Sequence, residues 1–158
     1  MTILVLGMGN TILTDDGVGI HVARAAQARH KEKATPDEVV FGEASVGGLR
    51  LLEVIVGYDG LVLVDAIQTV DGRPGDVHLL GPGDLPSMHS GSTHDLSLSG
   101  ALSLGRALQL KLPQDEAIVI VAVEVEDVLT FGEECTPAVA AAIPVAAGAV
   151  LSAVCNLS

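Results

Sequence analysis

Leu61-Val62-Leu63-Val64-Asp65-Ala66 is a run of four aliphatic residues that ends in a carboxylate. A second aliphatic run covers residues 2–6 and ends at Gly7. Continuous runs of this length are typical of strands that are buried on both faces, as in a parallel sheet. We therefore predict buried parallel strands over residues 2–6 and 61–65.

Segments with helical periodicity alternate with further strand-like segments along the rest of the chain. The predicted strands are 2–6, 38–42, 61–65, 76–80 and 117–123, and the predicted helices cover about 17–30, 49–56, 93–110 and 136 onward. Alternation of strands and helices predicts an α/β fold with a mostly parallel sheet. The strand at 76–80 follows its predecessor too closely for a helical crossover, so we expect it to be antiparallel and at an edge.

The length and the composition of the chain favour one globular domain over residues 1–158. A chain of 158 residues is long enough to bury a substantial core. The composition is 49% hydrophobic but only 2% aromatic, so this core must be aliphatic. We find no repeat, low-complexity segment or linker that would divide the chain.

Charge and cysteine usage narrow the possible partners and the compartment. A formal net charge of −12 argues against binding to nucleic acid and suits a solubilising surface or a basic partner. The apolar stretch 138–151 has 14 residues, fewer than the roughly 18 needed to span a bilayer, so we expect no membrane association. Two widely spaced cysteines and no signal-peptide pattern indicate the reducing cytoplasm.

Two carboxylates follow the first and third predicted strands. Asp16 lies in Thr14-Asp15-Asp16-Gly17, and Asp65 ends the run quoted above. Ligands of open α/β sheets bind beyond the carboxyl ends of the strands, and strands one and three are neighbours in the common orders. We predict that Asp15 caps the first helix, and that Asp16 and Asp65 are exposed in one crevice.

His94 is the third member of the candidate site. It falls in the first turn of the helix predicted over 93–110, where the helix dipole keeps an imidazole neutral and able to bind a metal. Two carboxylates and an imidazole suit zinc, nickel or manganese, with positions left open for substrate or water. His89 lies in the preceding loop and could contribute to the same site.

Three other chemistries fit the sequence less well. The turn Gly7-Met8-Gly9-Asn10 suggests a dinucleotide, but Ile12 stands where the fingerprint needs its third glycine. A serine hydrolase would need a Gly-x-Ser-x-Gly elbow, which this chain lacks. A cysteine nucleophile is disfavoured because Cys135 lies in an acidic loop that would raise its pKa, while Cys155 is almost terminal.

The motifs together resemble those of the hydrogenase maturation proteases. The resemblance rests on the segments 5–10, 15–19, 64–66 and 93–96, which read Val-Leu-Gly-Met-Gly-Asn, Asp-Asp-Gly-Val-Gly, Val-Asp-Ala and Thr-His-Asp-Leu. Proteases of this family remove a C-terminal extension from the large subunit of nickel–iron hydrogenases. The resemblance extends over nearly the whole chain, to the Thr136-Pro137 pair that opens the last helix.

This resemblance carries several expectations. It implies a three-layer α/β sandwich with a twisted five-stranded sheet, and it aligns Asp16, Asp65 and His94 with the family's three metal-binding positions. The nickel belongs to the hydrogenase large-subunit precursor, so we expect no resident metal and no organic cofactor. Whether that metal or a carboxylate activates the attacking water stays open. The segment 42–45, Gly-Glu-Ala-Ser, departs from the family's Asp-Gly-Gly-Thr/Ser pattern.

We therefore predict a cytoplasmic, monomeric endopeptidase that acts on the precursor after nickel insertion. Asp16, Asp65 and His94 serve as its catalytic and metal-contacting residues. The alternatives are a protein that senses the nickel site without cutting, and a nucleotide-binding α/β domain.

Overall fold

The computed structural model describes residues 1–31, 38–45, 49–84 and 93–158. Within these ranges, the side chains of residue 49 and of residues 93–97 are not described. Five strands form one sheet in the order β2-β1-β3-β5-β4. The strands are β1 (Thr2–Met8), β2 (Glu38–Ala44), β3 (Gly60–Ile67), β4 (Val77–Leu80) and β5 (Ile118–Glu124).

The strand directions confirm the predicted α/β sheet. The pairs β1–β2, β1–β3 and β3–β5 are all parallel, and β4 pairs with β5 in the antiparallel direction at one edge. The aliphatic runs form the three interior strands, which is where residues buried on both faces are needed. Strands one and three are neighbours, as predicted, with Gly7 opposite Val64.

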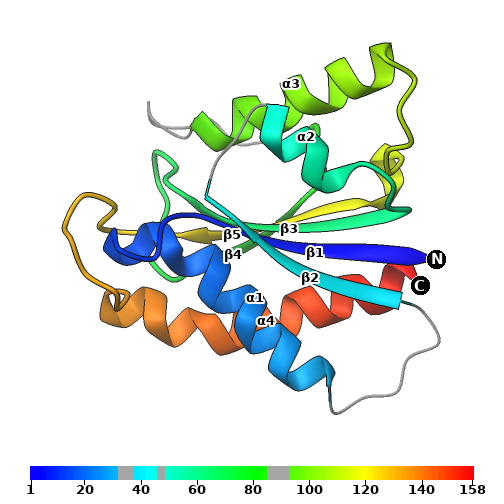
Figure 1. Cartoon of the computed structure of the whole chain (residues 1–158). Coiled ribbons are helices and arrows are strands. Elements are labelled where there is room, and N and C mark those ends of the chain that lie inside the picture. Colours follow the sequence, from blue (N-terminus) through cyan, green and yellow to red (C-terminus); the bar gives the residue numbers. More distant parts are fainter. Residues whose placement is uncertain (32–37, 46–48, 85–92) are drawn as a thin grey trace.

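Helices cover both faces of the sheet and make the predicted three layers (Figure 1). The helices are α1 (Val18–His30), α2 (Leu49–Ile55), α3 (Thr93–Ala107) and α4 (Pro137–Leu157), with short 3-10 helices η1 (Thr14–Gly17) and η2 (Asp115–Ala117). Helices α1 and α4 pack on one face and α2 and α3 on the other. Each strand supplies both cores by alternation, so Val62 and Val64 face α1 and α4 while Leu61 and Leu63 face α2 and α3.

Helix α4 is longer than the apolar stretch predicted from the sequence. It has 21 residues and a mean hydropathy of 2.2, which is long and apolar enough to cross a membrane by length and composition. The length argument against a membrane span was therefore wrong. Packing gives a different reason for its apolar character, because Val139, Ala147, Val150 and Val154 are buried against α1 and the sheet.

The two ends of the chain lie together at the amino edge of the sheet (Figure 1). A Cβ placed on Gly60, at the start of β3, would lie 3.1 Å from Met1 Cε and 3.5 Å from Leu157 Cδ1. The carboxyl ends of the parallel strands point to the opposite edge, where α1 begins.

Candidate active site at the carboxyl edge of the sheet

Asp16 is held at the end of β1 by a loop that folds back on itself. Gly9 has a φ of 138°, and a Cβ at that position would overlap the carbonyl oxygen of Asp16. Only glycine allows this approach without strain. The Asn10 amide donates to Asp16 Oδ2 at 3.0 Å, and the Asp16 side chain is half-buried.

Close packing of α1 fixes where this loop sits on the sheet. A Cβ on Gly19 would overlap the carbonyl oxygens of Met8 and Val64, so the first turn of α1 lies directly on the ends of β1 and β3. Helix η1, which contains Asp16, contacts β3. Asp16 therefore lies at the carboxyl edge of the sheet, beside β3, the strand that contains Asp65.

Asp65 lies inside β3, which continues to Ile67 instead of ending at residue 65 as predicted. The strand is longer because it stays paired with β5 as far as Glu124. Alternation puts Asp65 on the face covered by α2 and α3, where its side chain is only 2% exposed. The Ala66 amide donates to Asp65 Oδ1 at 2.8 Å. The prediction that this residue is exposed was wrong.

His94 lies in the first turn of α3, as predicted. Helix α3 covers the face on which Asp65 lies, and it begins at the carboxyl edge of the sheet (Figure 1). The His94 side chain lies outside the described part of the structure, and so does His89. The structure brings Asp16 and Asp65 to neighbouring strand ends, and the three-residue set stays a prediction.

Among the side chains that the structure describes, no three His, Cys, Asp or Glu residues gather into a group that could hold a metal ion. The predicted set includes His94, whose side chain is not among them. Asp16 and Asp65 supply oxygen ligands, which suit nickel only together with further donors.

Asp15 does not cap α1, which contradicts the prediction. The N-cap of α1 is Gly17, and it has no side-chain hydrogen bond. The Asp15 carboxylate is fully buried and accepts hydrogen bonds from the amides of Glu126, Asp127 and Thr136, at 3.0, 3.0 and 2.7 Å. The hydroxyl of Thr136 donates to the same carboxylate. Asp15 therefore ties the β1–α1 loop to the loop between β5 and α4.

A third buried carboxylate, Glu124, was not among the residues predicted from the sequence. Glu124 ends β5 on the face that also carries Asp65, and it is 2% exposed. It accepts hydrogen bonds from the hydroxyl and the amide of Thr69, and His78 Nε2 lies 3.5 Å from its Oε1. Its sequence signal is the one used for Asp65, a carboxylate that ends an aliphatic run.

Comparison with known proteins decides the family. The hydrogenase maturation protease model matches residues 20–153. The chain belongs to the hydrogenase maturation proteases. It is 33% identical over 105 residues to the hydrogenase 2 maturation protease of Escherichia coli K12, covering 65% of this chain and 62% of that protein.

Solved structures agree with this assignment. The hydrogenase maturating endopeptidase HybD from E. coli superposes with a TM-score of 0.81 and 30% identity, covering 99% of this chain and 93% of that one. A [NiFe] hydrogenase maturation protease from Thermococcus kodakarensis shares the fold, with a TM-score of 0.70 and 22% identity over 96% and 98% of the two chains. The maturation protease described here is therefore a peptidase with the α/β fold of this family.

Cys135 is a poor nucleophile in this maturation protease. Burial raises the pKa of its thiol to about 11, and the negative charge of Asp15 adds to the shift. The direction agrees with the sequence analysis, although burial contributes more than the acidic surroundings. Because the thiolate is the reactive form, a cysteine mechanism at this position is disfavoured near neutral pH.

The segment 42–45 pairs with β1 and also contacts α1 and the β1–α1 loop. Glu43 pairs with Arg24 through two bonds of 2.7 and 3.1 Å, and the Ala44 carbonyl accepts the Gly9 amide at 3.1 Å. The segment therefore supports the loop that carries Asp16.

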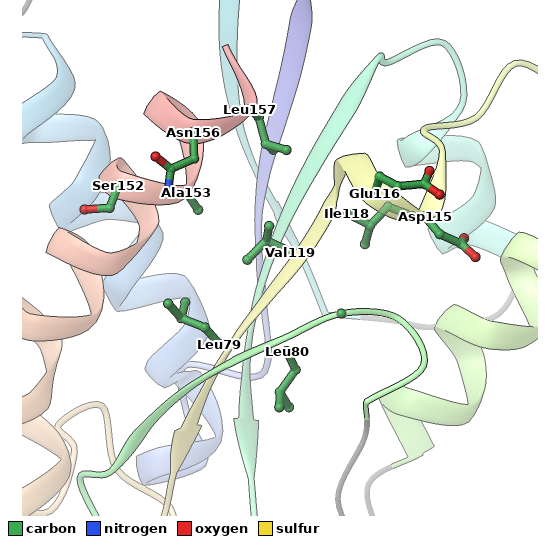
Figure 2. A pocket seen from close by; sticks show the side chains of 11 residues that line it. Leu79, Leu80, Asp115, Glu116, Ile118, Val119, Ser152, Ala153, Asn156 and Leu157 are labelled. Carbon is green, nitrogen blue, oxygen red and sulfur yellow. The ribbon is translucent and has the colours of Figure 1, made fainter.

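A pocket of about 500 Å³ lies at the opposite end of the sheet (Figure 2). Figure 2 shows Leu79 and Val119 on one side of it and Ala153 and Leu157 on the other, with Asp115 and Glu116 further along. It opens beside the amino end of β5, whereas ligands of parallel sheets bind at the carboxyl ends. This pocket is therefore separate from the candidate active site of the maturation protease.

Proposed function

We propose that this protein is the endopeptidase that removes the C-terminal extension of a nickel–iron hydrogenase large-subunit precursor after nickel insertion. The observation that carries the proposal is the placement of Asp16 and Asp65 at the carboxyl edge of neighbouring strands, in a chain of the maturation protease family. His94 enters at the start of α3, over the same edge.

In this proposal the nickel is part of the substrate. Asp16, Asp65 and His94 contact the ion in the precursor, which positions the tail for cleavage and makes cleavage depend on a completed metal site. Two routes to the attacking water fit these residues. The substrate's nickel polarises the scissile carbonyl, or a carboxylate removes a proton from the water.

We also propose that the reaction takes place in the cytoplasm and that the protein acts as a monomer. Cys135 and Cys155 are both free, which suits a reducing compartment. The net charge of −12 opposes self-association of like surfaces.

The test is to incubate the protein with precursor in nickel-loaded and nickel-free forms and to weigh the products by mass spectrometry. We expect one C-terminal peptide to be released from the loaded precursor only. Cleavage of both forms at equal rates would contradict nickel recognition. A stable complex without any product would instead indicate a sensor that does not cut.

The site assignment is tested by Asp65→Asn. Asn keeps the shape of this buried side chain, whereas Ala would leave a cavity. The matched control is Asp115→Asn, which makes the same change to an exposed carboxylate at the opposite end of the sheet. We expect Asp65→Asn to abolish processing and the control to process at the parental rate.

A further inference from the structure

Two loops at the carboxyl edge carry exposed apolar side chains. Leu129 is 84% exposed, Phe131 is 81% exposed and Ile12 is 50% exposed. The chain has only two phenylalanines, one tyrosine and no tryptophan, so one of its few aromatic residues stands in solvent. We call Ile12, Leu129 and Phe131 the loop patch.

Backbone hydrogen bonds join these two loops. The Gly132 amide donates to the Ile12 carbonyl at 2.9 Å, and the Thr14 amide donates to the Gly132 carbonyl at 2.9 Å. The hydroxyl of Thr14 donates to the carbonyl of Thr130. These bonds place Ile12 beside the segment 129–131, so the exposed apolar side chains come from adjoining segments.

The loop patch is held in a fixed shape from below. The buried Asp15 carboxylate binds amides on both flanks of residues 129–131, at Asp127 and at Thr136. Asp127 Oδ1 accepts the amides of Leu129 and Thr130 at 3.0 and 2.9 Å. Binding through a preformed loop costs less conformational entropy than binding through one that must order first.

The surroundings of the loop patch are acidic. Glu126, Glu133 and Glu134 are exposed beside it, and residues 124–136 contain no Lys or Arg. A pocket of about 300 Å³ next to the patch is lined by Glu133, Glu134, His21 and Cys135, together with Ala140 and Ile143. Two carboxylates that line a small pocket suit a Lys or Arg side chain.

We propose that the loop patch docks the body of the precursor. The surface of the precursor that binds there presents an apolar depression flanked by basic side chains. This inference rests on the proposed function. The loop patch adjoins the site, because Ile12 and Asp16 share one loop and the amide of Asn10 binds the Asp16 carboxylate. A protein bound there lies beside the edge at which its tail is cut.

The acidic surroundings of the loop patch favour the precursor over two other binding partners. A second copy of the chain would bring the same carboxylates face to face, and a bilayer with anionic lipids would also repel them. Aromatic side chains such as Phe131 are enriched in protein interfaces, where a few well-buried residues near the centre supply most of the binding energy.

The experiment measures KM and kcat for processing of nickel-loaded precursor by Phe131→Ser and Leu129→Ser. The dissociation constant of the complex is measured in an Asp65→Asn background, where the precursor is not consumed. The matched control is Leu108→Ser, which replaces a leucine that is 60% exposed just after α3. Thermal unfolding checks that each variant is folded.

We expect each patch variant to raise KM and the dissociation constant by about tenfold or more with kcat unchanged, and Leu108→Ser to stay within about twofold of the parent. Glu133→Gln combined with Glu134→Gln should weaken the salt dependence of binding. Patch variants that bind and process like the parent would overturn the inference. So would a concentration-dependent dimer of the parent that Phe131→Ser dissolves.

The same measurements separate this inference from the proposed function. If the parent binds the precursor but never shortens it, the proteolytic function is wrong, and the dissociation constants still test the loop patch. If the parent shortens the precursor and the patch variants do so equally well, the function stands and the loop patch does not. A parent that neither binds nor cuts overturns both.

Discussion

Strands β3 and β5 are neighbours, and each ends an aliphatic run in a carboxylate that is only 2% exposed. Alternation places Asp65 and Glu124 on the same face of the sheet. Glu124 is bound by Thr69 from the β3–β4 connection and approached by His78 from β4. One hydrogen bond of Asp65 comes from the amide of Ala66, the next residue in its own strand. Burial alone therefore does not separate a carboxylate that holds the fold from one that serves the site.

The largest expected effect is on catalysis. Asp65→Asn should lower the processing rate by a factor of about 10² to 10⁴, the range for losing a positioned acid or base. Glu124→Gln should leave the rate per folded molecule within about twofold of the parent. Initial rates of precursor shortening check both. Equal losses in the two variants would remove the distinction drawn between the two strand ends.

The adjacent pair Asp15 and Asp16 extends the comparison to stability. Asp15→Ala should lower the free energy of unfolding by about 3–5 kcal/mol, because three amides lose the buried carboxylate that binds them. Asp16→Ala should cost about 1 kcal/mol, since Asp16 is half-buried and accepts one amide in the described part of the chain. Urea denaturation measures both values. If Asp15→Ala lowered the free energy of unfolding by less than Asp16→Ala, Asp15 would not be the structural carboxylate of the pair.

Glu124→Gln should have an intermediate effect on stability. We expect a loss of about 1–2 kcal/mol, because the hydrogen bonds from Thr69 are weakened when the carboxylate loses its charge. The exposed control Glu43→Gln should cost less than about 1 kcal/mol, as is usual for a surface ion pair. Chemical denaturation of the two variants side by side provides the measurement.

The smallest expected effect concerns Asp127, a half-buried carboxylate held within its own turn. Hydrogen bonds from Thr130, and then from Leu129, lower the pKa of Asp127 below its ordinary value. Because the pKa of Asp127 is lowered in the folded state, its carboxylate stabilises the fold at pH values above about 4. This contribution is lost as the pH falls through the lowered pKa. The NMR signals of the Leu129 and Thr130 amides should therefore titrate below pH 4. They should not do so in Asp127→Asn, and a midpoint above the ordinary value would contradict the assignment.

Local patterns in the sequence were enough to predict the sheet. The aliphatic runs predicted the interior strands, and the short connection before residue 77 predicted the antiparallel edge strand. The end of β3 was misplaced because its last residues are held by pairing with β5, which no pattern within 61–67 reveals. The apolar stretch within α4 was predicted to end at residue 151 because Ser152 is polar, whereas the helix continues through Ser152 to Leu157.

The roles of the carboxylates were less predictable. Asp15 looked like a helix cap because its partners lie more than 100 positions away, in residues 126–136. Glu124 carried the same signal as Asp65 and could have been found from the sequence. Separating the two required knowledge of where Thr69 and His78 lie in the folded chain.

The meeting of the two chain ends beside Gly60 has a practical consequence. Both ends leave the molecule at the edge of the sheet that faces away from Asp16 and Asp65. An affinity tag or a fluorescent fusion attached at either end will therefore not obstruct the approach of a bulky substrate. A short linker could also join the ends, so that new termini can be opened in an exposed turn elsewhere on the surface.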